Sequence, residues 1–166
     1  MDCEEITRTL QWLGMELLRP EVLSDRDTTP MAVLTAQGMA GPAFSHVLMF
    51  DAEMIADHGD YADWVREWAK ATGKSHLLSD VDDSIDFDGG TSWLSCTLDG
   101  RTTRVEFMQY GDYLDPEVAA TVEEDFSDVP GRTRVRGSLG QTGTFAWVPD
   151  DTVDAFLEFI PTLTRG

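Results

Sequence analysis

An Asp99-Gly100 pair separates two stretches of alternating apolar and polar residues, Trp93–Leu98 and Arg101–Met108. Asp-Gly is typical of a two-residue type I′ turn, because both residues of that turn need positive φ angles. Such a turn pairs Leu98 with Arg101 and gives the hairpin one apolar and one polar face, as in an antiparallel sheet that helices cover on one side. The apolar face is predicted to hold Leu94, Cys96, Leu98, Val105 and Phe107.

Helical and strand patterns elsewhere give the order of the elements. Asp60 and Asp115 stand where helix N-caps are expected. The predicted helices cover residues 4–18, 60–72 and 115–126, with a last one beginning at Asp150 or Asp151, and the predicted strands cover 44–50, 77–87, 93–98, 101–108, 131–137 and 142–148. Residues 20–43 are predicted to be a long connection, with room for a short strand at 31–35. Because strands cluster and are joined by short turns, the class is α+β, with a mostly antiparallel sheet of about five to six strands and helices packed mainly on one face. With no repeat and no linker, one domain over residues 1–166 is expected.

The chain carries 31 Asp and Glu against 12 Lys and Arg, a formal charge of −19 on 166 residues. A surface of this charge repels nucleic-acid phosphates and anionic membranes, and it attracts basic proteins. We therefore expect a basic protein partner, with no nucleic acid and no membrane among the partners. Adaptation to high salt, in which abundant carboxylates keep the surface hydrated, is an alternative origin of the acidity and stays open.

The N-terminus, Met1-Asp2-Cys3-Glu4-Glu5, is acidic where a secretory signal would be basic, and no apolar run approaches the ~18 residues of a membrane span. Cys3 and Cys96 are the two cysteines, and a chain with enough length for its own core does not need them as a disulfide scaffold. These features predict a cytoplasmic protein with reduced thiols.

Motifs of catalytic specificity are missing from the sequence, which has no Gly-x-Ser-x-Gly elbow, phosphate-binding loop or zinc spacing. The segment 80–89 matches a calcium loop in part, because Asp86 and Asp88 stand at ligand positions. Ser84 and Ser95, however, replace its first Asp and its bidentate Glu, so an acidic strand leading into a turn is favoured. We therefore expect no enzymatic activity, no metal and no cofactor.

Arg132, Arg134 and Arg136 alternate along one predicted strand and so share a face. Two interpretations stay open. The three guanidinium groups form an intramolecular ladder with nearby carboxylates, or they anchor the carboxylates of a partner or an anionic ligand.

Acidic residues concentrate between Asp112 and Asp128, and Tyr110 and Tyr113 lie at the start of this stretch. Carboxylates bordered by exposed aromatic rings suit docking onto a basic protein, because charge steers the approach and rings supply buried contact. A solvated helix face that aids solubility is the alternative. The residues predicted to face a partner are Asp82, Asp83, Asp86, Asp112, Tyr113, Glu117 and Glu124.

Three features extend over most of the chain: an acidic helix ahead of the sheet, the Asp99-Gly100 hairpin, and a closing run at 140–149 that leads into a helix. In these features the chain resembles, as a class, the immunity proteins of bacterial polymorphic-toxin and contact-inhibition systems. The resemblance implies a cytosolic inhibitor without catalytic residues that binds and occludes a cognate basic toxin domain, such as a nuclease or other nucleotide-acting enzyme. The alternatives are a chaperone for a secreted effector, a small enzyme whose acidity is salt adaptation, and a DNA mimic. The sequence predicts no oligomeric state.

Overall fold

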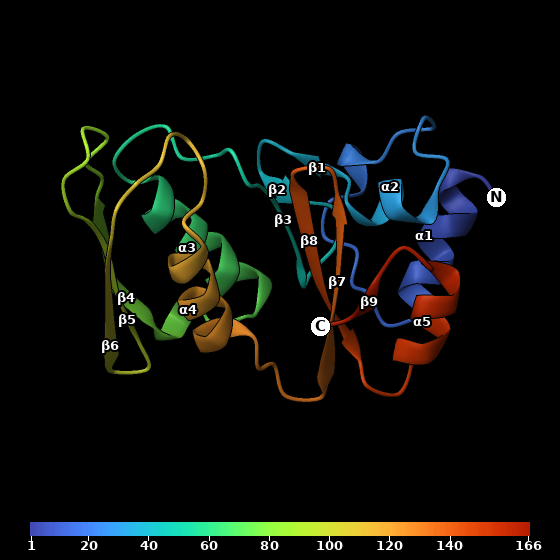
Figure 1. The fold of residues 1–166 in the computed structure, drawn as a ribbon. Coiled ribbons are helices and arrows are strands. Elements are labelled where there is room, and N and C mark those ends of the chain that lie inside the picture. The colour runs from blue at the N-terminus through green and yellow to red at the C-terminus, as the bar shows by residue number, and fades with distance from the viewer. The chain divides into compact units, whose positions relative to one another are not determined.

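The computed structural model describes residues 1–166, apart from the side chain of Leu139. The chain divides into two compact units, residues 1–49 with 129–166 (unit 1) and residues 50–128 (unit 2) (Figure 1). The α+β class is confirmed. The single sheet of five to six strands is wrong, because the nine strands of the described backbone form three antiparallel sheets. The expectation of one domain over residues 1–166 stays a prediction.

Unit 1 is built on a four-stranded sheet in the order β3-β8-β7-β9. Its strands are β3 (Val47–Asp51), which runs into the start of unit 2, β7 (Arg132–Leu139), β8 (Thr142–Pro149) and β9 (Thr164–Arg165). The remaining elements are α1 (Cys3–Trp12), the 3₁₀ helix η1 (Pro20–Val22), α2 (Pro30–Leu34), the small hairpin of β1 (Gln37–Gly38) and β2 (Gly41–Pro42), and α5 (Val153–Phe159). Figure 1 shows α1, α2 and α5 on the same side of the sheet. The core between these layers includes Ile6, Leu10, Phe44, Val135, Ala146, Val148 and Phe156.

Two predictions for unit 1 need correction. The predicted strand at 31–35 is wrong, because Thr29 and Pro30 start the helix α2 there and the Ala32 N–H donates to Thr29 Oγ1 at 3.2 Å. The first helix ends at Trp12 instead of residue 18, and Gly14 just beyond it adopts a φ of 86°. The second hairpin is confirmed, with residues 132–139 of β7 antiparallel to 142–149 of β8.

Unit 2 is a three-stranded antiparallel sheet covered by two helices on one face. The strands are β4 (Leu78–Ser84), β5 (Ser92–Leu98) and β6 (Arg101–Phe107), and the helices are α3 (Asp60–Ala71), the 3₁₀ helix η2 (Ser75–Leu77) and α4 (Pro116–Phe126). Helix α3 contacts β4 and β5, and α4 contacts β6. The predicted register around Asp99-Gly100 is confirmed, with Leu98 opposite Arg101. All five residues of the predicted apolar face are buried.

The first turn of α3 is capped by a side chain from the sheet. Asp60 was predicted as the N-cap, but Gly59 occupies that position with a φ of 97° and has no capping side chain of its own. Asp83 of β4 supplies the carboxylate instead, accepting the Gly59 N–H at 2.6 Å and the Ala62 N–H at 2.8 Å. A carboxylate at this end also interacts favourably with the helix dipole. The cap predicted at Asp115 is confirmed, since Asp115 Oδ1 accepts the N–H groups of Glu117 and Val118.

We predict that Asp83→Ala lowers the free energy of unfolding by about 2–3 kcal/mol, because the N–H groups of Gly59 at the N-cap and of Ala62 in the first turn of α3 lose their acceptor. Unfolding in urea followed by tryptophan fluorescence measures this, since Trp64 and Trp68 lie on α3. Asp82→Ala is the control, because Asp82 lies next to Asp83 on the same strand and is exposed, and it should cost less than about 0.5 kcal/mol. Equal losses in the two variants would contradict the capping role.

Candidate acidic docking surface

The two units differ strongly in charge. Unit 2 holds 20 of the 31 acidic residues and 5 of the 12 basic ones, so −15 of the formal charge of −19 lies within residues 50–128. Between Arg104 and Arg132 the sequence has no Lys or Arg. The negative potential is concentrated where the carboxylates gather, so a surface of this chain that acts through charge is expected in unit 2.

Two segments of unit 2, residues 52–55 and 108–117, carry exposed acidic and apolar side chains. Backbone hydrogen bonds join them, from the Ile55 N–H to the Asp112 carbonyl at 3.0 Å and from the Leu114 N–H to the Ala52 carbonyl at 2.7 Å. We call the exposed residues of the two segments the acidic–aromatic surface. Its members are Glu53, Met108, Tyr110, Asp112, Tyr113 and Glu117.

The tyrosines of this surface are exposed to solvent to an unusual degree for aromatic residues. Tyr110 is 70% exposed and Tyr113 is 51% exposed. A hydrogen bond between the Tyr113 side chain and the Glu53 carboxylate raises the pKa of the Tyr113 hydroxyl, and the charges of Glu53 and Asp112 act in the same direction. The Tyr113 side chain is thus held beside a carboxylate while about half of the residue stays exposed, an arrangement that suits a cationic side chain.

A buried pair of polar side chains lies beneath the surface. The Tyr61 hydroxyl of α3 donates to Gln109 Oε1 at 2.8 Å and accepts the Asp115 N–H at 2.8 Å. The Gln109 amide nitrogen donates to the carbonyls of Gly111 and Tyr113 at 3.0 and 2.7 Å. This Tyr61–Gln109 pair therefore connects the start of α3 to the loop that presents Tyr110, Asp112 and Tyr113.

The end of β4 is tied to the same end of α3. The Ile85 N–H donates to His58 Nδ1 at 2.9 Å, and Asp83 caps the helix as described above. The acidic segment 82–88 therefore begins close to the start of α3. Within it Asp86 accepts the Asp88 N–H at 2.8 Å, and Phe87 is 47% exposed.

The predicted partner-facing residues fall into three groups. Asp112, Tyr113 and Glu117 belong to the acidic–aromatic surface, and Glu124 is exposed two turns further along α4. Asp82 is exposed and Asp86 half-buried, both on the segment at the end of β4. Asp83 is different: it is buried and its carboxylate is occupied by α3, so it belongs to the interior of unit 2. Sequence reasoning missed Glu53, which lies 60 residues from Tyr113 along the chain.

The basic residues of unit 2 are engaged elsewhere in the unit. Arg66, Lys70, Arg101 and Arg104 form ion pairs with Asp63, Glu67, Asp125 and Glu106, respectively, and Lys74 donates to the carbonyls of Asp125 and Phe126. None of these carboxylate partners belongs to the acidic–aromatic surface. These ion pairs therefore do not neutralise the carboxylates of that surface.

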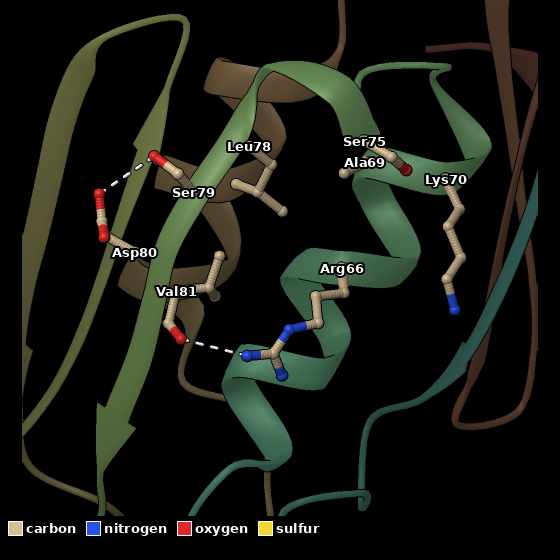
Figure 2. Close-up of a pocket in the computed structure, with 8 residues that line it drawn as sticks. All are labelled: Arg66, Ala69, Lys70, Ser75, Leu78, Ser79, Asp80 and Val81. Carbon is tan, nitrogen blue, oxygen red and sulfur yellow. Dashed lines mark hydrogen bonds between the residues drawn. The ribbon is translucent and has the colours of Figure 1, made fainter.

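A groove of about 520 Å³ runs between α3 and β4 and contains two of these cations (Figure 2). Figure 2 shows the Arg66 side chain reaching from α3 to the Val81 carbonyl, with a hydrogen bond of 3.1 Å. Arg66 also pairs with Asp63 at 2.6 Å, and Lys70 pairs with Glu67 at 2.5 Å. Because both cations already have carboxylate partners in an acidic unit, the groove is a weaker candidate for an anion site than the acidic–aromatic surface is for a cation.

The arginine row of β7 makes contacts within unit 1. Arg132 donates to the Trp147 carbonyl at 2.8 Å, and the Arg134 guanidinium lies over the Phe145 ring at 5.4 Å. Burial lowers the pKa of Arg132, and the charge of Glu16 opposes this effect. The first two arginines thus pack against a backbone carbonyl and an aromatic ring of the neighbouring strand β8.

The part of the sequence that resembles a calcium loop does not form one. Ser84 ends β4 and Ser95 lies within β5, so the residues at the loop's two ends belong to paired strands. Among the side chains that the structure describes, no three His, Cys, Asp or Glu are grouped so that they could hold a metal ion.

Comparison with protein-family models, curated proteins and solved structures finds no match to this chain. No helix in the described part of the chain has the length and apolar character needed to cross a membrane. The geometry and charge of unit 2 are therefore the features of this chain that bear on its function.

We predict that the Tyr61 hydroxyl keeps its proton in folded protein at pH 11. Burial raises its pKa well above the ordinary value of 10, although the hydrogen bond from the Asp115 N–H acts in the opposite direction. Because the unfolded state ionises near pH 10 and the folded state does not, this group's contribution to stability is complete below pH 10 and declines as the pH rises further. Tyrosinate absorbance at 295 nm should therefore be the same for wild type and Tyr61→Phe up to pH 11, and wild type should show extra absorbance only on unfolding. A larger signal in folded wild type would contradict the burial of this hydroxyl.

Proposed function

We propose that this chain is a cytosolic inhibitor of the immunity-protein type, which binds a cognate basic toxin domain through the acidic–aromatic surface of unit 2 and occludes it. The partner is proposed to be a nuclease or other nucleotide-acting enzyme, whose substrate site is cationic. Carboxylates would exclude the anionic substrate from that site, so the inhibitor needs no catalytic residue, metal or cofactor of its own.

The observation that carries this proposal is the juxtaposition of exposed tyrosines with carboxylates on one surface. Interfaces favour Tyr because its large ring adds buried contact area, while the surrounding charges steer the approach of an oppositely charged partner. Tyr110, Tyr113 and Met108 supply the apolar contact, and Glu53, Asp112 and Glu117 supply the charge. Asp82, Asp86 and Glu124 extend the acidic area on neighbouring elements of the same unit.

The distribution of charge favours a partner over salt adaptation. A carboxylate surplus that only hydrates the surface is expected on all exposed parts of a protein. Here the formal net charge of unit 1 is −4 and that of unit 2 is −15, although the two units are of similar length. Selection for binding at one place accounts for this asymmetry, since only the surface that meets a cationic partner needs the charge.

The partner can be identified by crosslinking in the native host. A photoreactive phenylalanine analogue at Tyr110 is expected to capture a basic protein, whereas the same analogue at Trp12, which is 76% exposed in unit 1, is not. The captured protein should have an enzymatic activity that the wild-type chain suppresses. A neutral or acidic captured protein, or one whose activity is unaffected, would contradict the proposal.

Charge reversal tests the surface itself. We predict that the triple variant Asp112→Lys, Glu117→Lys and Glu124→Lys weakens binding to the captured basic protein by at least about 100-fold at low salt, and by less at high salt, because screening reduces the attraction. Calorimetry or surface plasmon resonance measures the affinity.

The matched control reverses three exposed carboxylates of unit 1, Glu21→Lys, Asp25→Lys and Asp151→Lys, and so changes the net charge by the same amount. It should weaken binding by less than about threefold, since none of these three carboxylates belongs to the acidic–aromatic surface. Equal losses in the two triple variants would mean that total charge, and not this surface, determines binding. A chain that dimerises and binds an extended segment instead would favour the chaperone alternative.

A further inference from the structure

The loop from residue 109 to residue 115 is held from beneath by the Tyr61–Gln109 pair. Tyr61 is 0% exposed and Gln109 is 4% exposed, so neither side chain exchanges its hydrogen bonds with bulk water. The Tyr61 ring packs edge-to-face against Phe107, with centroids 5.0 Å apart. This ring contact positions the Tyr61 hydroxyl independently of the loop.

Every side-chain proton that the Tyr61–Gln109 pair can donate has an acceptor. The Tyr61 hydroxyl proton goes to Gln109 Oε1, and the two protons of the Gln109 amide nitrogen go to the carbonyls of Gly111 and Tyr113. The same hydroxyl oxygen accepts the Asp115 N–H. Loop carbonyls and a loop N–H are thus bound at 111, 113 and 115, which leaves the loop backbone little freedom while Tyr110, Asp112 and Tyr113 point outward.

We propose that Tyr61 is a positioning residue for the acidic–aromatic surface: its buried hydroxyl holds the 109–115 loop in the docking arrangement before any partner arrives. This role of Tyr61 rests on the function proposed above, and it explains how the loop keeps its binding conformation in the free protein. A preformed surface binds with less loss of conformational entropy than a loop that must be ordered on contact. Tyr61 acts through the loop and does not itself touch the partner.

Hydrogen exchange of Tyr61→Phe without any partner tests this. The informative amides are those of Ile55 and Leu114, because they donate to backbone carbonyls across the two segments and not to Tyr61. If Tyr61 positions the loop, both should exchange at least about tenfold faster in Tyr61→Phe, while amides of the β5–β6 hairpin change by less than about twofold.

Two results would overturn the proposal. Acceleration confined to the Asp115 amide would mean that the hydroxyl serves only its own hydrogen bond. Equal acceleration of all amides in unit 2 would mean that Tyr61 contributes only to general stability. Thr152→Val is the control variant, because it removes a hydroxyl that donates to the Leu13 carbonyl in unit 1 and should leave Ile55 and Leu114 unchanged.

The second measurement uses the basic protein captured by the wild-type chain. Tyr61→Phe should bind it about tenfold more weakly with an unchanged dependence on salt, because the variant keeps every charge of the surface. Unchanged affinity together with faster exchange would overturn the link between loop order and docking. If wild type captures no basic protein, the proposed function fails, and the exchange measurement still decides whether Tyr61 positions the loop.

Discussion

The contact on which unit 2 depends most is the one between Asp83 and the first turn of α3. A helix that begins at a glycine has no side chain of its own to accept its first N–H groups. Asp83 fills this role from β4, and in doing so it fixes where α3 starts relative to the sheet. The Tyr61 hydroxyl, two residues into the helix, is then in reach of Gln109 and Asp115. The acidic–aromatic surface is therefore a consequence of how one helix is anchored.

The same arrangement moderates the cost of concentrating negative charge. Asp115 caps α4 and also donates its N–H to Tyr61, so the N-terminal ends of α3 and α4 both lie at this side of unit 2. The positive ends of two helix dipoles and their unpaired N–H groups favour carboxylates nearby. Asp83 and Asp115 accept such N–H groups directly, whereas Asp60 accepts the N–H groups of Ala56 and Asp57 in the loop before α3. Part of the negative charge of unit 2 is thus stabilised internally, while Asp112 and Glu117 remain exposed.

Local chemistry explains which parts of this fold were predictable from the sequence. The Asp99-Gly100 turn sets the register of its own hairpin, and Asp115-Pro116 starts α4, because the deciding residues are neighbours in the chain. The division of strands among three sheets was not predictable in this way, since nothing near the second hairpin indicates that β7 and β8 join β3 and β9. The spacing of Tyr61, Trp64 and Trp68 is typical of a buried helix face, but the hydrogen-bond partner of Tyr61, Gln109, is 48 residues away. The capping role of Asp83 was not predictable for the same reason. In the sequence Asp83 cannot be distinguished from its exposed neighbour Asp82, because the start of α3 that it caps lies more than 20 residues earlier in the chain.

The proposed mode of binding connects stability with function. Carboxylates brought together on one surface repel one another, so they lower the stability of the free protein even where helix dipoles offset part of the effect. A cationic partner removes that repulsion, and this relief adds to the affinity beyond the direct contacts. Added salt then acts in opposite directions, stabilising the free chain by screening repulsion and weakening the complex by screening attraction. If the acidity served only to hydrate the surface, the chain would form no such complex. Added salt would then only stabilise the free protein.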